Sequence, residues 1–370
     1  MRFPEFTEEW KEERLSKIAE LSKGVGISKE QLSEDGEPCI LYGELYTKYK
    51  SEIIHKVISK TNIESSNLKR SKRNDVIIPC SGETAIDIAV ARCVPFDNIL
   101  LGGDLNIIRL HKDDGAFMAY QLNGKRKIDI AKLAQGVSVV HLYGENIKAI
   151  KTYNPCLQEQ QKIVKLLSML DERIEVQNKI IEDLKKLKSA ISERLFKSVK
   201  GSTVLLSDLC DIVKGKQING ENLSDSGNYY VMNGGTEPSG YYDNYNVEAS
   251  TISISEGGNS CGYVQFNTSP FWSGGHCYSI QNIADKVDNM YLYHYLKSNE
   301  DAIMKLRIGS GLPNIQKKDL AMFKIIVPKI EWQIKISTFL SSLERKAEIE
   351  ERIQNVMQKQ KLYLLQQMFI

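Results

Sequence analysis

Two glycine-free segments with the same residue pattern constrain the fold of this chain more than any other feature. None of the 25 glycines lies in residues 155–200 or 328–370, and each of these segments begins with a proline. Glycine favours turns and costs about 1 kcal/mol inside a helix, so its absence indicates helix. We therefore predict two long helices, the first of which would extend roughly 60 Å at about 1.5 Å per residue.

Both segments repeat apolar residues with the alternating spacing of four and three that is typical of coiled coils. The predicted seam consists of Ile163, Leu167, Leu170, Ile174, Ile181, Leu184, Ile191 and Leu195 in the first segment, and of Ile336, Leu340, Leu343, Met357, Leu364 and Met368 in the second. Polar residues interrupt it at Gln177, Lys188, Glu350 and Lys361, and we expect them to fix the register of an antiparallel pair. A competing apolar stripe on the second helix predicts contact with a further neighbour; it consists of Ile349, Ile353 and Val356.

The two segments align without a gap at a constant offset of 173 residues, so that Pro155 matches Pro328. Even the polar interruptions of the seam coincide. The preceding segments carry a fainter copy of the same repeat at an offset of 191, where Lys23-Gly24 matches Lys214-Gly215. The chain is therefore predicted to be an internal duplication with pseudo-twofold character.

The glycine-containing segments contain short β-like runs that end in glycine pairs, for example residues 99–101 before Gly102-Gly103 and residues 271–272 before Gly274-Gly275. We predict a mixed α/β (α+β) fold in which two globular modules alternate with the two helices. The predicted boundaries are 1–154 for the first module, 155–200 for the first helix, 201–327 for the second module and 328–370 for the second helix.

Motifs for catalysis and for metal binding are missing from the sequence. The seven cysteines are scattered without a C-x-x-C pair, no phosphate-binding loop is present, and no nucleophile and base are suggested by spacing. We predict no catalytic residue, no metal site and no bound cofactor. No apolar run is long enough to span a membrane, the residues after Met1 do not form a signal peptide, and the odd cysteine count favours a reducing, cytoplasmic compartment.

If the chain binds nucleic acid, charged and amide side chains near turns are the candidates for its contacts. The basic candidates for phosphate contacts are Lys69, Arg70, Lys72, Arg73, Lys125, Arg126, Lys127, Lys214, Lys216, Lys305 and Arg307. The candidates for reading base edges are Arg109, Gln217, Asn233 and Asn259. The alternative for the lysine and arginine runs is a solvated loop, and the alternative for the amides is hydrogen bonding within turns.

The helical segments resemble one known family. The string of Pro155, Leu157, Glu159, Gln160, Lys162 and Ile163 resembles the central conserved region of the specificity subunits of type I restriction-modification enzymes, and the region from Pro328 to Phe369 resembles its second copy. Arg2-Phe3-Pro4-Glu5-Phe6 is similar to that family's N-terminus. In the second copy Trp332 stands in place of Glu159 and Glu344 in place of Asp171; Trp332 is expected either to pack on the adjoining module or to contact a partner subunit.

The resemblance implies that each module reads one half of a split double-stranded DNA target and that the helices set the gap between the halves. It also implies assembly with two modification (methyltransferase) subunits and two restriction (motor-nuclease) subunits, which would bind S-adenosylmethionine, ATP and magnesium. The net charge of +2 excludes only a simple basic DNA-binding protein, and residues 201–327 sum to −4. The alternative function is a scaffold that binds two copies of a protein partner without DNA.

Overall fold

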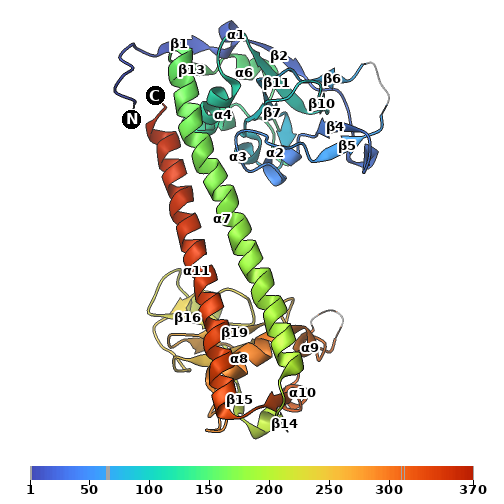
Figure 1. Cartoon of the computed structure of the whole chain (residues 1–370), viewed down its shortest axis with the longest axis vertical. Helices are drawn as coiled ribbons and strands as arrows, with labels where there is room; N and C mark the ends of the chain where they lie inside the picture. The colour runs from blue at the N-terminus through green and yellow to red at the C-terminus, as the bar shows by residue number, and fades with distance from the viewer. Residues whose placement is uncertain (1, 64–66, 310, 312, 370) are drawn as a thin grey trace. The chain divides into compact units, whose positions relative to one another are not determined.

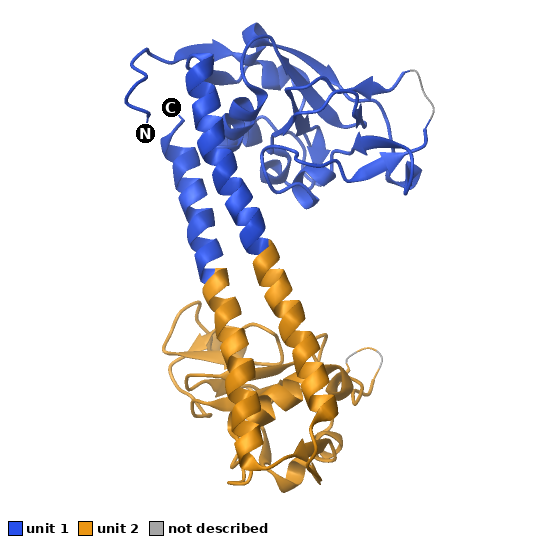
Figure 2. Cartoon of the chain, in the orientation of Figure 1, with its two compact units in different colours: residues 1–178, 352–370 blue, residues 179–351 orange. Residues whose placement is uncertain are grey.

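The computed structural model of the chain describes residues 2–63, 67–309, 311 and 313–369. It divides into two compact units, of which unit 1 comprises residues 1–178 and 352–370 and unit 2 comprises residues 179–351 (Figure 2). The two longest helices are α7 (Leu157–Ser198) and α11 (Ile330–Gln367), and each unit takes one half of each of them (Figure 1). The predicted helical segments are therefore confirmed.

Unit 1 is built on an antiparallel sheet with the strand order β2-β11-β7-β9. These strands are β2 (Ala19–Lys23), β11 (Leu105–Leu110), β7 (Asp75–Pro79) and β9 (Arg92–Val94). A second sheet of order β3-β5-β4-β10-β6 consists of β3 (Leu32–Ser33), β5 (Ser59–Thr61), β4 (Glu37–Ile40), β10 (Leu100–Leu101) and β6 (Lys69–Arg70). Two further antiparallel pairs complete the unit: β8 (Ser81–Gly82) pairs with β12 (Val140–His141), and β1 (Lys11–Arg14) pairs with β13 (Lys151–Asn154).

The helices of unit 1 are short except for the halves of α7 and α11. They are α1 (Leu15–Ile18), α2 (Glu44–Thr47), α3 (Ala85–Ile88), α4 (Gly115–Asn123), α5 (Lys127–Lys132) and α6 (Gly144–Lys148), with a 3₁₀ turn η1 (Lys29–Gln31). The helix α4 is buried along almost its whole length and packs on β7 and β9. Its Phe117 contacts Trp10 and Phe369 in an aromatic cluster that joins this module to the helix pair.

Unit 2 repeats this plan with fewer residues. Its main sheet has the order β15-β21-β18-β19, formed by β15 (Asp211–Lys214), β21 (Cys277–Gln281), β18 (Thr251–Ser255) and β19 (Val264–Asn267). The smaller sheet consists of β17 (Tyr241–Tyr242), β16 (Tyr229–Met232) and β20 (Trp272–Ser273), and β14 (Ser202–Leu205) pairs with β22 (Lys324–Val327). The remaining elements are α8 (Asn289–Ser298), α9 (Glu300–Met304), α10 (Lys317–Ala321) and the 3₁₀ turns η2 (Leu206–Asp208) and η3 (Gly220–Asn222).

The predicted seam residues are all buried or half-buried; they lie on α7 and α11 except for Met368, which directly follows α11. Within unit 1, Gln354 donates a hydrogen bond to Asn178. Within unit 2, Lys185 forms an ion pair of 2.6 Å with Glu351. Residue numbers on α11 fall as those on α7 rise, so the helices run antiparallel in both units. The competing stripe stays exposed, with 47% exposure at Ile349, 39% at Ile353 and 64% at Val356.

Two repeated glutamines attach each module to the start of a long helix. The amide of Gln160 accepts a hydrogen bond from the backbone N–H of Asp114 and donates one to the Pro155 carbonyl, at 2.8 and 2.9 Å. Gln333 does the same with Asp288 and Pro328, both at 2.8 Å. Since Asp114 and Asp288 cap α4 and α8 through their carboxylates, each glutamine ties a capped module helix to α7 or α11.

Candidate nucleic-acid interface

Glycine-rich loops of unit 2 meet at one end of its main sheet. The Gly215 N–H donates to the Cys277 carbonyl, Gly274 N–H to Met232, and Gly258 N–H to Pro313, at 2.8 to 3.0 Å. The structure brings five predicted DNA-contacting residues together here: Lys214 at the end of β15, and Lys216, Gln217, Asn233 and Asn259 on the loops. Arg307 joins them, because the next residue, Ile308, bridges to Asn314 and Asn314 bridges to Gly257.

Lys305 lies apart from these loops. It follows α9 and, with His294 and Lys188, lines a hollow of about 690 Å³ beside α7. It remains a predicted phosphate contact, but it does not share the surface formed by the glycine-rich loops.

The amides among these candidates also support the turns on which they stand. The Asn233 side-chain oxygen accepts a hydrogen bond from the His276 N–H at 3.2 Å and lies against Gly274, where a β-carbon would be only 2.5 Å from it. The Gln217 oxygen lies 2.3 Å from the corresponding position on Gly275. The Asn233 amide therefore makes the turn-stabilising hydrogen bond that was its alternative, whereas Gln217 donates a longer hydrogen bond, of 3.4 Å, to the adjacent Ile218 carbonyl. Base contacts by both amides stay predictions.

A charged cluster at the centre of these loops was not predicted from the sequence. Glu256, which is buried, accepts hydrogen bonds from Lys214 Nζ at 2.6 Å and from the Tyr278 hydroxyl at 3.1 Å on the same oxygen, Oε1. Its other oxygen, Oε2, lies 3.7 Å from His276 Nδ1, and the His276 side chain is 63% exposed. Burial, reinforced by the Glu256 charge, raises the pKa of Tyr278, so this hydroxyl stays protonated and can donate.

The basic candidates of unit 1 lie in two regions, one on the strands β6 and β11 and the turn before β7, and the other after α4. Lys69 and Arg70 form β6 at the edge of its sheet, where Arg70 makes a bidentate pair with Glu37 at 2.5 and 3.1 Å. Lys72 and Arg73 follow in the turn before β7. Arg109, on β11, makes a bidentate pair with the buried carboxylate of Asp75 at 2.8 and 2.7 Å, which raises the arginine pKa.

The second basic run of unit 1 lies after α4. Arg126 pairs with Asp129 at 3.1 Å, and its guanidinium lies 4.8 Å from the centroid of the Tyr153 ring. Lys125 and Lys127 flank it. Arg109 and Arg126 thus have their guanidinium groups engaged within the module by bidentate or stacked partners. Their first contacts are structural, and any contact with DNA would be made by the parts of the guanidinium that remain exposed.

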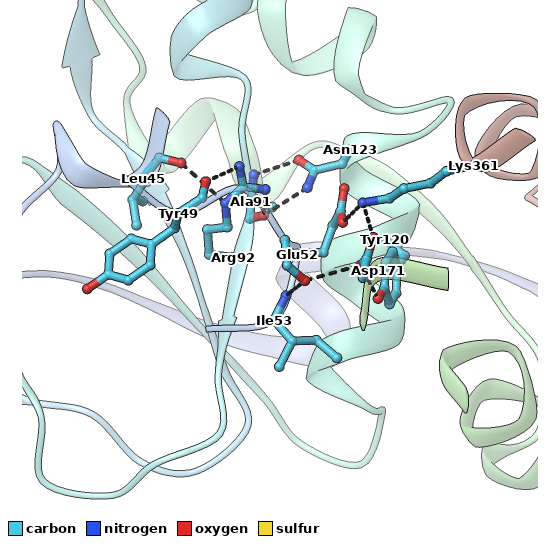
Figure 3. A network of polar contacts seen from close by, with 11 residues as sticks. Leu45, Tyr49, Glu52, Ile53, Ala91, Arg92, Tyr120, Asn123, Asp171 and Lys361 are labelled. Atoms are coloured by element: carbon cyan, nitrogen blue, oxygen red, sulfur yellow. Dashed lines mark hydrogen bonds and ion pairs between the residues drawn. The ribbon is translucent and has the colours of Figure 1, made fainter. Parts of the chain in front are cut away.

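A buried ionic cluster, which we call clasp 1, joins the first module to both long helices (Figure 3). Lys361 of α11 lies 2.5 Å from Asp171 of α7 and 2.5 Å from Glu52 of the module. The Tyr120 hydroxyl of α4 donates to Asp171 at 2.7 Å. Burial and the Asp171 charge raise the Tyr120 pKa, while nearby Arg92, whose pKa is lowered by burial, supplies a second cation.

Clasp 2 repeats this arrangement in unit 2 with the helices exchanged. Lys188 of α7 lies 2.5 Å from Glu344 of α11, and the Tyr293 hydroxyl of α8 donates to Glu344 at 3.1 Å. Lysine, acid and tyrosine each match their counterparts in clasp 1 at the offset of 173. The polar interruptions at Lys188 and Lys361 therefore do pair across the helices, and sequence comparison of Tyr120 with Tyr293 could have found the third member.

The cysteines, potential metal ligands and helices bear on whether the chain can form disulfides, metal sites and membrane spans. All seven cysteines are unpaired thiols, and burial raises the pKa of Cys39, Cys80 and Cys277 to about 11. Among the residues that the structure describes, no group of three or more His, Cys, Asp or Glu side chains is arranged to hold a metal ion. None of the described helices combines the length and apolarity needed to cross a bilayer.

Comparison with known proteins gives consistent results along the chain. The family model described as the type I restriction modification DNA specificity domain matches twice, at residues 7–186 and 200–359. Proteins named as putative type I specificity subunits in Mycoplasma genitalium and Mycoplasma pneumoniae are 34% and 32% identical over 32% and 39% of this chain. These matches cover only 31% and 38% of the mycoplasmal proteins.

Longer matches extend over nearly the whole chain. A type I restriction enzyme specificity subunit of Methanocaldococcus jannaschii is 24% identical over 96% of this chain and 90% of its own length. The crystal structure of the S subunit of a type I restriction-modification system from M. genitalium superposes with a TM-score of 0.69 and 19% identity, covering 98% of this chain and 96% of that one. The fold is thus shared across the full alternation of modules and helices.

Proposed function

Because this chain belongs to the family of type I restriction-modification DNA specificity domains, we propose that it is the specificity subunit of such a system. Residues 1–154 and 201–327 are then two target-recognition domains, each of which binds one half of a bipartite double-stranded DNA sequence. The observation that carries this proposal is the duplication, which extends from the strand order of the two sheets to the members of clasps 1 and 2. A duplicated protein with two modules suits a target with two half-sites.

The long helices have two roles in this proposal. They hold the two recognition domains and so set the length of DNA left unread between the half-sites. They also bind two modification subunits, and the full complex adds two restriction subunits. Methyl transfer, ATP-driven translocation and cleavage belong to those partners, together with S-adenosylmethionine, ATP and magnesium. The seven free thiols are in keeping with a cytoplasmic location.

Exposed apolar residues on the helices support the docking of partner subunits. Leu166 and Phe339 are 39% and 46% exposed, and Val176 and Ile349 are 59% and 47% exposed. The members of each pair are separated by the repeat offset of 173. Exposed apolar side chains that recur in both copies suit two identical partners better than two different ones. Trp332 is also exposed, at 59%, but its counterpart in the first copy is the buried Glu159, so it does not recur in both copies.

The test is domain exchange in cells that supply the modification subunits. Residues 1–154 are replaced by the corresponding segment of a specificity subunit with another known target, and the methylated sequences are determined for the whole genome. We expect one half of the methylated sequence to change and the other half to persist. If both halves persist, the recognition assignment fails; if the wild-type chain directs no methylation at all, the scaffold alternative gains.

A further inference from the structure

Each module contains the same close approach of a Lys-Gly pair to a Gly-Gly pair. In the first module the Gly24 N–H donates to the Leu105 carbonyl at 2.9 Å, and a β-carbon on Gly24 would lie 1.9 Å from the Gly102 carbonyl oxygen. In the second, Gly215 donates to Cys277 at 2.8 Å, and its β-carbon would lie 2.2 Å from the Gly274 oxygen. Only glycine permits these contacts, which place Lys23 and Lys214 at equivalent positions.

A second set of hydrogen bonds identifies the other members of the two sites. Cys80 donates its N–H to the Asp104 carbonyl at 2.7 Å, and Glu256 donates its own to the His276 carbonyl at 2.9 Å. Cys80 in turn accepts from the N–H of Leu142, and Glu256 accepts from the N–H of Ile315. Asp104 and His276 are therefore structural counterparts, as are Cys80 and Glu256, although the intervening loops differ in length.

The side chains at these matched positions differ in chemistry. In the first module Asp104 accepts a hydrogen bond from the Ser81 hydroxyl at 3.2 Å, and Lys23 lies 6.0 Å from the centroid of the Tyr143 ring, which is 47% exposed. In the second module the matched positions form the cluster of Lys214, Glu256 and His276. A shared backbone with different exposed polar groups is what two readers of different sequences need.

The cluster of the second module is arranged to present hydrogen-bond donors outward. Glu256 is buried and its Oε1 is shared by Lys214 and Tyr278. Its Oε2 has no hydrogen-bond partner among the described residues and lies 3.7 Å from His276 Nδ1. Lys214, at 53% exposure, keeps two further N–H groups available.

We propose that these matched sites are the base-reading positions of the two modules, and that Lys214 of the second module donates its two further N–H groups to the O6 and N7 acceptors of a guanine, with Glu256 as the positioning residue. Guanine presents two acceptors side by side in the major groove, and a pair of neighbouring donors is the arrangement that selects it. Lys23 and Asp104 occupy the matched site of the first module and read a base of the other half-site. This proposal rests on the proposed function and names the residues that carry it out.

The experiment uses the full chain assembled with its modification subunits and duplexes that carry the methylated sequence found in cells. Each guanine of the second half-site is replaced in turn by 7-deazaguanine, which removes N7 and keeps base pairing. We expect one such position to weaken wild-type binding about 10-fold, Lys214→Met to weaken binding to the unmodified duplex by a similar factor, and the variant to be indifferent to 7-deazaguanine at that position. Glu256→Gln, which preserves shape, should reduce the same discrimination in part.

Two control variants separate base reading from phosphate binding. Lys216→Ala, on the same loop, should weaken all duplexes alike, and Lys23→Met should affect only the first half-site. Uniform weakening of matched and mismatched duplexes by Lys214→Met would reassign the site to phosphate binding and overturn the proposal. A second half-site without guanine would also overturn it. Failure of the wild-type complex to bind its duplex would instead overturn the proposed function, so the two failures are distinguishable.

Discussion

Replacement of Lys361 by methionine tests how much clasp 1 contributes to the stability of unit 1. Lys361 Nζ lies 2.5 Å from carboxylate oxygens of both Glu52 and Asp171, and the three side chains are only 14%, 7% and 5% exposed. With Arg92 nearby, the cluster holds two positive and two negative charges. Methionine keeps the length of the side chain but leaves one buried negative charge uncompensated, which costs about 3–5 kcal/mol when a buried pair is broken.

The assay is amide hydrogen exchange, because it reports each unit separately where a single unfolding curve would mix them. We expect Lys361→Met to lower protection in α4 and in the parts of α7 and α11 that belong to unit 1, while protection in β18 and β21 is unchanged. Lys188→Met is the matched control. Clasp 2 has one carboxylate, and its lysine and glutamate are 21% and 28% exposed, so the cost should be nearer 1 kcal/mol.

A second variant tests whether the loss comes from charge. Adding Glu52→Gln to Lys361→Met removes the uncompensated negative charge, and the double variant should regain at least half of the lost stability. Equal losses from Lys361→Met and Lys188→Met, or no recovery in the double variant, would refute the electrostatic reasoning and leave only lost packing.

Three further predictions concern acidity, salt and helix length. Burial lowers the His294 pKa to about 4, below its unfolded value of about 6.5, so the unfolded chain binds more protons between these values and unit 2 should lose up to roughly 3 kcal/mol of stability as pH falls from 6.5 to 4. Measured by hydrogen exchange, this pH dependence should be smaller in His294→Asn and unchanged in His55→Asn, whose histidine is exposed. Equal slopes of stability against pH in the wild type and both variants would contradict the prediction. The isolated chain, with a net charge of +2, should bind its target weakly and lose affinity steeply with salt, whereas the complex with modification subunits binds tightly; full affinity of the chain alone at physiological salt would disprove this. Insertion of seven residues at one point of α7 should change the tolerated gap or abolish binding, measured with duplexes of graded spacer length, and an unchanged gap would rule out the helices as a spacer.

The helices, the seam and the duplication were predictable because their signals are local and repeated. Heptad spacing depends only on residues three and four apart, and the copy at offset 173 doubles the evidence for it. The same periodicity identified Lys188 and Lys361 as interruptions of the seam. It did not identify their partners, Glu344 for the first and Asp171 with Glu52 for the second, since Glu52 comes from a loop far away in the sequence.

The candidate interface was less predictable, because its members come from loops of unequal length. Lys214, Gln217 and Asn233 could be proposed from their residue types beside glycines, but neither Glu256 nor His276 belongs to a motif. Arg109 was a reasonable base reader by type, yet in the fold its guanidinium pairs with the buried Asp75. That pairing depends on neighbouring strands, and a sequence pattern does not record which side chains face each other across them.

The sequence by itself therefore determined the alternation of modules and helices, because helix periodicity and glycine placement are properties of short stretches of chain. Only the tertiary structure decided which charges meet in the clasps and which side chains stand at the matched sites of the two modules. The clasps form where α7 and α11 pack together, and the matched sites form where strands such as β7 and β11, or β18 and β21, bring distant loops to the same end of a sheet. The loops of the two copies differ in length, but the hydrogen bonds that anchor them are the same. These hydrogen bonds match Cys80 with Glu256 and Asp104 with His276, which alignment of the sequence had not done.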